Sequence, residues 1–153
     1  MHDRLIRIGV AILAIGIAPV ALWATLSPRG FYDDFPGGGR HWVALDGPYN
    51  EHLVRDVGAL SLALLLVAVW ALVTSSRPLV QAAAAAFLVN GVLHVVYHLA
   101  NLDGYETADQ IGIGGGLLLA PIVAGLVLVG ATMRPSSSSP SSTSVLPAPT
   151  ARS

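Results

Sequence analysis

Four long stretches without a charged residue constrain this chain more than any other feature. Asp, Glu, Lys and Arg are absent from Ile8 to Leu26, Val57 to Ser76, Pro78 to Leu102 and Gln110 to Met133. Each stretch holds 19 to 25 residues, and a helix needs about 20 apolar residues to cross the ~30 Å hydrocarbon core of a bilayer. Only 11% of all residues are charged, against about 25% in an average soluble domain. The sequence therefore predicts an all-α integral membrane protein with four spans.

The expected organisation is a four-span transmembrane domain over residues 1–134, followed by a tail over residues 135–153. Helices are expected at about 5–26, 51–75, 78–101 and 110–133, with two longer connections at 27–50 and 102–109 on one side of the bilayer. The connection 27–50 mixes Gly and Pro with aromatic residues, so it is expected to form no more than a short turn or two. The tail is rich in Ser and Pro and has no apolar face to bury, which predicts disorder.

The charges are distributed unevenly along the chain. Five of the eight arginines lie before the first span, between the second and third, or after the fourth. Eight of the nine acids lie in or near the connections 27–50 and 102–109, on the opposite side of the bilayer. Arginine near span ends favours the cytoplasm, so both termini are expected inside, in a bacterial-type inner membrane. The first stretch could instead be a cleaved signal, although its 19 residues exceed the usual signal core. The few basic residues offer nucleic acid no binding surface, and the absence of cysteine excludes thiolate sites.

Small residues recur along the fourth predicted helix. Gly112, Gly116, Ala120 and Ala124 are spaced by four residues and lie on one face. Lipid tails are as apolar as leucine, so helix packing in a bilayer depends on small residues that let backbones approach. This ridge predicts a compact four-helix bundle.

Polar side chains follow one face of the third predicted helix. Asn90, His94, Tyr97, His98 and Asn101 fall within an arc of about 100°. Ionisable groups within spans are costly, and they usually face the bundle and mark function. These residues are therefore candidates for a functional site.

The second predicted helix begins with its own polar pair. His52 and Asp56 share one face through their four-residue spacing. Asn50 or Asp46 is expected to cap the start of this helix. A tight connection, Thr74-Ser-Ser-Arg-Pro78, makes the second and third helices an antiparallel hairpin.

The hairpin predicts that the polar residues of the second and third helices meet at the outer end of the bundle. Counted from a turn near Ser76, His52 and His98 lie 24 and 22 residues away, and Asp56 and His94 lie 20 and 18 residues away. At 1.5 Å per residue these offsets amount to only about 3 Å. The four residues are expected to form one cluster, provided that both helices have the right rotation.

Three histidines and a carboxylate are a competent ligand set for Zn, Cu or Fe. Neighbouring groups that could supply further hydrogen bonds or a general base are His41, Glu51, Arg55, Asn90, Tyr97, Asn101 and Asp103. A haem between His52 and His94 or His98 is a less favoured alternative, because these rings lie close to the outer surface. The cluster also suits a hydrogen-bond network that only holds the helices together, or proton or small-ligand handling.

Three segments, Phe31-Tyr-Asp-Asp-Phe-Pro36, Gly47 to Leu60 and His94-Val-Val-Tyr-His98, resemble those of small, uncharacterised four-helix membrane proteins of bacteria. The resemblance covers about Leu5 to Met133 and implies the four-span topology without an activity. Two functions follow from the residues. One is a metal-dependent membrane enzyme or metal-handling protein. The other is an accessory or scaffold protein that acts with a membrane-protein partner or as a homo-oligomer.

Overall fold

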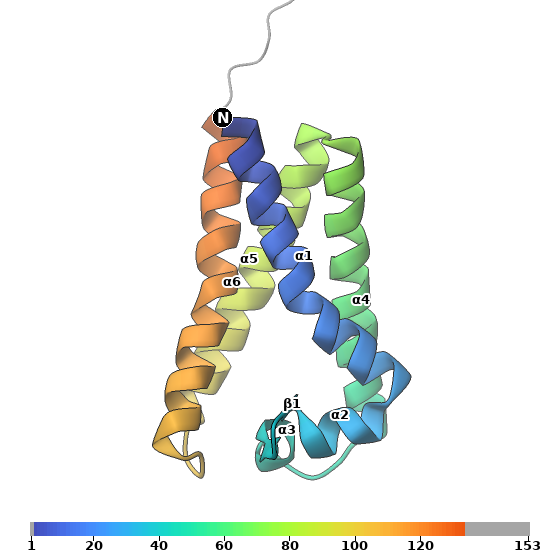
Figure 1. The fold of residues 1–153 in the computed structure, drawn as a ribbon, viewed down its shortest axis with the longest axis vertical. Coiled ribbons are helices and arrows are strands. Elements are labelled where there is room, and N and C mark those ends of the chain that lie inside the picture. Colours follow the sequence, from blue (N-terminus) through green and yellow to red (C-terminus); the bar gives the residue numbers. More distant parts are fainter. Residues whose placement is uncertain (1, 134–153) are drawn as a thin grey trace, which may run out of the picture.

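The computed structural model describes residues 2–133 and shows a bundle built on four long helices (Figure 1). These are α1 (His2–Leu26), α4 (Glu51–Thr74), α5 (Arg77–Ala100) and α6 (Thr107–Met133). Each is long and apolar enough to cross a membrane. The predicted all-helical bundle with four candidate spans is thus confirmed. The predicted disordered tail, 135–153, lies outside the described residues.

Local sequence explains where the central helices begin and end. Oδ1 of Asn50 accepts a hydrogen bond from the backbone N–H of Leu53 at 3.1 Å, so Asn50 caps α4. Asp46, the other candidate, does not cap this helix. At its other end α4 stops at Ser75, which has a left-handed φ of 52° and donates its backbone N–H to Ala71 O at 2.9 Å. Pro78 lies in the first turn of α5, where its missing N–H costs no helical hydrogen bond.

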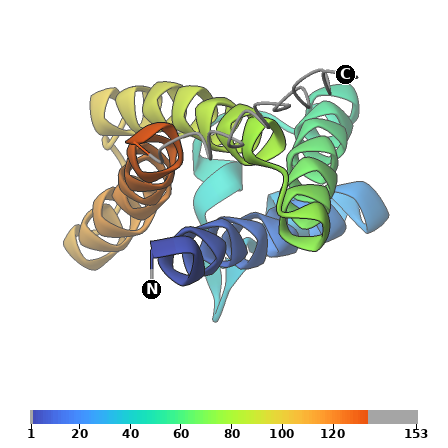
Figure 2. The same cartoon turned by 90° about the horizontal axis from the view of Figure 1, so that it is seen from above.

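The four helices form two pairs, α1 with α4 and α5 with α6 (Figures 1 and 2). The pairs lie close together at the end that holds His2, the α4–α5 turn and Met133, which we call the terminal end. They separate toward the opposite end, which carries residues 27–50 and which we call the capped end. The bundle is therefore tight at one end and open at the other.

Glycines mark the closest approach within each pair. A Cβ on Gly58 of α4 would lie 2.8 Å from the backbone N of Thr25 and 2.9 Å from the carbonyl carbon of Ala24 in α1. A Cβ on Gly91 of α5 would lie 2.9 Å from Cδ of Pro121 in α6. Neither site has room for a side chain, so both pairs pack backbone against backbone in the way that small residues allow.

The main hydrophobic core lies toward the terminal end. It consists of small and medium-sized side chains from all four helices: Val10, Leu13, Ala14, Ala68, Ala71, Val80, Ala83, Ala84, Phe87, Ala124, Val127 and Ala131. A Cβ on Gly9 would lie only 2.4 Å from the side chain of Val127, so α1 and α6 are also in close contact here. This core joins the two pairs to each other.

The small-residue ridge of α6 packs along only part of its length. Ala124 is fully buried, and Ala120 packs against the main core. A Cβ on Gly116 would meet no atom of the described chain within 4 Å, and a Cβ on Gly112 would first meet the Trp42 ring at 3.4 Å. The two glycines therefore border open space and residues 27–50, because α6 leaves the α1–α4 pair toward the capped end.

Residues 27–50, which we call the cap, are folded, so the expectation of a short turn or two is wrong. The cap contains α2 (Pro28–Asp34), an antiparallel hairpin of β1 (Pro36–Gly37) and β2 (Arg40–His41), and α3 (Trp42–Leu45). The hairpin turns through Gly37, Gly38 and Gly39, whose φ values of 99°, 66° and 77° belong to the left-handed region that favours glycine.

Aromatic packing gives the cap its order. The Trp23 ring at the end of α1 meets the rings of Phe31 and Phe35 edge to face, at centroid distances of 6.2 and 6.1 Å. Phe35 in turn meets Trp42 at 6.4 Å. Phe31 is buried with Ala24 and Val54 in a second, smaller core. The Gly and Pro residues of this segment favour breaks in regular structure, but the aromatic residues between them pack on one another and give the segment a fixed fold.

Candidate ligand cavity

A cavity of about 690 Å³ lies between the two helix pairs beneath the cap. All four long helices and the cap contribute to its walls, and most of the lining side chains are apolar. Val20 comes from α1, Leu53 and Val57 from α4, and Leu117 from α6. Its volume falls within the range of about 300–1,000 Å³ that is typical of small-molecule sites.

Most of the polar lining of this cavity comes from α5, and Asp46 and Asn50 add polar side chains from the cap. Asn90, His94, Tyr97 and His98 all line it, so four members of the predicted polar stripe share one wall. Asn90, His94 and His98 follow at four-residue intervals and form a column about 12 Å long. Asn101, the fifth member of the stripe, does not join them, because its side-chain amide donates to the Tyr97 carbonyl oxygen at 2.8 Å.

The two histidines of the column lie one turn apart, with their ring centroids separated by 4.6 Å. Nδ1 of His98 is enclosed by protein and has no hydrogen-bond partner among the described residues. Any polar contact from a ligand to this ring must therefore use Nε2. Imidazole nitrogens can donate or accept hydrogen bonds, so the column can bind either kind of polar group.

Asp46 and Tyr105 were not among the predicted site residues, and they connect the cap to the α5–α6 pair. The Tyr105 hydroxyl lies 2.8 Å from both Oδ1 of Asp46 and the carbonyl oxygen of Trp42, and its proton can be donated to either acceptor. Burial, reinforced by the hydrogen bond with Asp46, raises the pKa of Tyr105 above its ordinary value of 10.0. The hydroxyl therefore keeps its proton at neutral pH and can donate it in a hydrogen bond. The sequence signals for this link are Tyr105 in the connection 102–109 and acidic residues in both connections.

An ion pair makes a second connection across the capped end. Nε of Arg40 in the cap lies 2.5 Å from Oδ1 of Asp109 in α6. Together with Tyr105, this pair attaches the cap to one helix pair, while the aromatic core attaches it to the other. The cap thus bridges the two pairs over the cavity.

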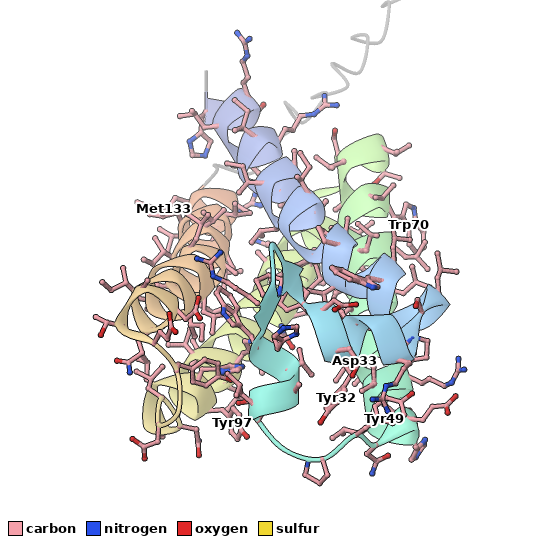
Figure 3. All side chains as sticks on the ribbon, turned by 60° about the horizontal axis from the view of Figure 1, so that its bottom comes forward. Tyr32, Asp33, Tyr49, Trp70, Tyr97 and Met133 are labelled. Atoms are coloured by element: carbon pink, nitrogen blue, oxygen red, sulfur yellow. The ribbon has the colours of Figure 1, made fainter. Side chains whose placement is uncertain are left out.

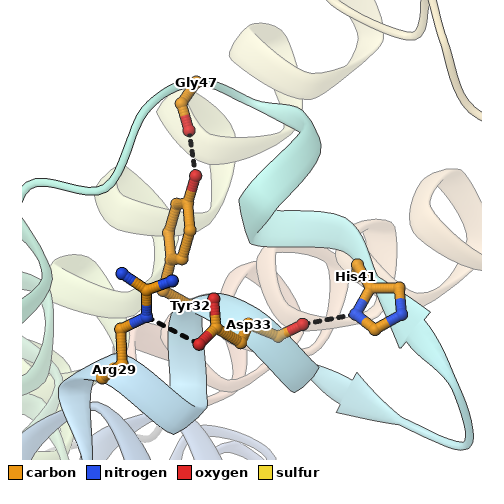
Figure 4. Close-up of polar contacts among 5 residues, drawn as sticks. All are labelled: Arg29, Tyr32, Asp33, His41 and Gly47. Atoms are coloured by element: carbon orange, nitrogen blue, oxygen red, sulfur yellow. Dashed lines mark hydrogen bonds and ion pairs between the residues drawn. The ribbon is translucent and has the colours of Figure 1, made fainter.

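Polar bonds within the cap hold its own elements together (Figure 4). The Tyr32 hydroxyl donates to the Gly47 carbonyl oxygen at 2.7 Å, and Nε of Arg29 donates to Oδ2 of Asp33 at 2.6 Å. His41 donates from Nδ1 to the Asp33 carbonyl oxygen. His41 therefore stabilises the cap and does not line the cavity. Figure 3 shows Tyr32 and Tyr49 on the α4 side of the capped end and Tyr97 on the α5 side.

The four predicted metal ligands do not come together. Only His94 and His98 line the cavity. His52 and Asp56 interact with each other, Nε2 to Oδ2, at 3.5 Å, and their side chains are 87% and 54% exposed. Within residues 2–133, no group of three or more His, Asp or Glu side chains is placed to hold a metal ion. The expectation of one shared cluster therefore needs correction.

Two features of the helices account for this difference. First, α4 and α5 diverge from their turn, so an equal level along the hairpin does not bring side chains together (Figure 1). Second, α4 is rotated so that Leu53 and Val57 line the cavity. His52 and Asp56 precede these residues by one position, which places them about 100° around the helix.

The remaining predicted neighbours lie away from the cavity. Glu51 and Arg55 form an exposed ion pair at 2.8 Å on α4, and Asp103 is exposed in the α5–α6 connection.

Comparisons with protein-family models, curated proteins and solved structures find no match for this chain. Its function has to be inferred from the geometry of the cavity.

Proposed function

We propose that this protein is a multi-pass membrane protein that binds a small amphipathic molecule in the cavity beneath the cap. One observation carries the proposal: a cavity of about 690 Å³ has mainly apolar walls, a polar column on α5, and Asp46 and Asn50 as further polar groups from the cap. Small-molecule sites typically combine such walls with a few convergent polar groups that orient the ligand.

The unpaired polar groups support a ligand with a hydrogen-bonding head. Within residues 2–133, the side chains of Asn90 and His94, which are exposed and line the cavity, have no hydrogen-bond partner. Polar groups inside a bundle normally find partners, since an unpaired group in an apolar setting is costly. A ligand whose polar head contacts α5 and whose apolar part contacts the remaining walls would satisfy both surfaces.

The position of the cavity favours a ligand that arrives through the lipid. Leu53 and Leu93 line it from α4 and α5, yet they keep 61% and 65% of their surfaces exposed. We therefore place an opening of the cavity between these two helices. In a bilayer this opening would face acyl chains, which suits an amphipathic molecule dissolved in the membrane.

A metal-dependent activity is the weaker proposal. The cavity offers two imidazoles on one helix and the carboxylate of Asp46. Within residues 2–133 no three such groups are placed to hold one metal ion, whereas structural and catalytic zinc sites use three or four protein ligands. A scaffold role is compatible with the folded cap but does not account for the cavity. Ligand binding therefore explains more of the geometry.

The membrane orientation belongs to this proposal as well. We propose that the terminal end faces the cytoplasm, because Arg4, Arg7 and Arg77 lie there and most acids lie at the capped end. A reporter that is active only in the cytoplasm should work when fused after Arg134 and fail when inserted at Gly38. The reverse pattern would place the cavity in the inner leaflet.

Ligand binding can be tested with 1-dodecanol, which has an apolar chain and a hydroxyl head. The full chain in detergent should be stabilised saturably against thermal unfolding by dodecanol. Gly116→Phe should abolish this stabilisation, because Gly116 lines the cavity and has space for a side chain. Gly115→Phe is the matched control, since Gly115 also has open space but does not line the cavity.

The polar column can be tested in the same assay. His94→Leu should weaken the response to dodecanol while leaving the response to dodecane unchanged. Equal behaviour of the Gly115 and Gly116 variants would refute binding in the cavity.

A further inference from the structure

A second, smaller pocket lies at the terminal end, at the opposite end of the bundle from the capped cavity. It has a volume of about 240 Å³ and lies where α1 begins, α4 turns into α5, and α6 ends. Its charged lining groups are the guanidinium groups of Arg7 and Arg77 and the carboxylate of Asp3. The pocket therefore carries two positive charges against one negative charge.

Arg77 is held in place by the end of α6. Its Nε donates to the Ala131 carbonyl oxygen at 2.8 Å, and its Nη2 donates to the Thr132 carbonyl oxygen at 2.8 Å. A guanidinium group has five N–H donors, so three remain for another partner. The helix terminus fixes the group without neutralising it by a carboxylate.

Arg7 supplies the second guanidinium group. Within residues 2–133, no acidic side chain forms an ion pair with Arg7, whereas Arg29, Arg40 and Arg55 each pair with an acid. The pocket thus brings together one fixed and one unpaired guanidinium group. Two neighbouring guanidinium groups are well suited to binding an oxyanion, because their N–H donors match the geometry of phosphate oxygens.

We infer that this pocket binds a phosphate-bearing anion, supplied by the headgroup of an anionic phospholipid. The pocket lies beside the ends of the apolar stretches, at the level where headgroups lie around a membrane-spanning bundle. Ile6 and Val80 line it beside the arginines and provide apolar contacts for the glycerol and acyl part of a lipid. Basic pockets between transmembrane helices recognise anionic headgroups in this way.

The inference can be tested by titrating fluorescent phosphatidylglycerol into the purified full chain in a neutral detergent. We expect one saturable site. Arg7→Gln should weaken binding about fivefold, the loss that corresponds to about 1 kcal/mol for one basic residue near a membrane surface. Arg7→Lys, which keeps the charge but loses the guanidinium donors, should weaken binding less than Arg7→Gln. Unchanged thermal unfolding of both variants would show that changes at this position do not prevent folding.

Arg4 provides the matched control. It lies on the same helix and is exposed, but it does not line the pocket, so Arg4→Gln should weaken binding less than twofold. Equal losses in Arg4→Gln and Arg7→Gln would overturn the inference, because they would report general surface charge. A further titration uses inorganic phosphate as competitor. Displacement of the lipid by millimolar phosphate would overturn the lipid assignment and identify soluble phosphate as the occupant. These outcomes are independent of ligand binding beneath the cap.

Discussion

The link between Tyr105 and the cap can be tested by removing a single oxygen atom. Tyr105→Phe keeps the ring, which is only 6% exposed, but it deletes the hydroxyl that lies 2.8 Å from both Asp46 Oδ1 and the Trp42 carbonyl oxygen. A neutral hydrogen bond contributes about 0.5–1.5 kcal/mol to stability, and one to a charged group about 1.5–3 kcal/mol. Because one proton serves both acceptors, we expect a loss of about 2 kcal/mol in the free energy of unfolding.

This loss should depend on pH with a defined sign. The pKa of Tyr105 is raised in the folded protein by burial and by Asp46, whereas in the unfolded chain it is about 10. The contribution of the hydroxyl is therefore fully present below about pH 10 and disappears as the pH rises toward the raised pKa. The parent protein should lose stability in this range, and the Phe variant should not show this additional loss.

Chemical unfolding in detergent measures the effect, and limited proteolysis within the cap reports whether the cap loosens. Tyr97→Phe is the control, because Tyr97 lies nearby on α5 and its hydroxyl has no hydrogen-bond partner among residues 2–133. The reasoning is refuted if Tyr105→Phe unfolds at the same denaturant concentration as the Tyr97 variant and the cap stays equally resistant to protease.

Other variants test the packing and the separation of the polar groups. Gly58→Ala should cost about 1–3 kcal/mol in unfolding free energy, since its Cβ would meet the backbone of α1, whereas Gly116→Ala should change stability little. A stable Gly58→Ala protein would show that α1 and α4 are not in such close contact. Asn50→Ala should lower the free energy of unfolding by about 1 kcal/mol, because it removes the hydrogen bond that Asn50 Oδ1 accepts from Leu53 at the start of α4. An unchanged melting temperature would contradict this role. The effects of His52→Ala and His98→Ala should add within about 0.5 kcal/mol, because the two residues share no partner. A strong deviation from additivity would restore the single cluster.

The helices themselves were predictable because they depend on local properties. An uninterrupted apolar stretch with charged ends specifies a long helix without reference to its neighbours, and Asn50 specifies a helix start through a bond to a residue three positions away. The polar wall of the cavity was also accessible from the sequence, since the four-residue spacing of Asn90, His94 and His98 places them on one face of α5 whatever surrounds the helix.

The arrangement of the helices was not predictable by the same reasoning. Spacing along a hairpin gives the level of a residue, but not the rotation of the helix or its distance from the neighbouring helix. The rotation of α4 is set by Gly58, which must face Ala24 and Thr25, and the sequence shows the glycine without its partners. The cap depends on ring contacts and on the distant Tyr105 and therefore shows no periodic signal.

The order of helix contacts has a consequence for how the chain is made. Each tight pair is continuous in sequence: residues 2–74 contain α1, the cap and α4, and residues 77–133 contain α5 and α6. A ribosome would therefore deliver two helical hairpins in succession, each of which begins and ends at the terminal end of the bundle (Figure 1). The first hairpin can seat Gly58 against α1 before α5 has been synthesised. Its cap, however, can gain the contacts with Tyr105 and Asp109 only after the second hairpin has been made.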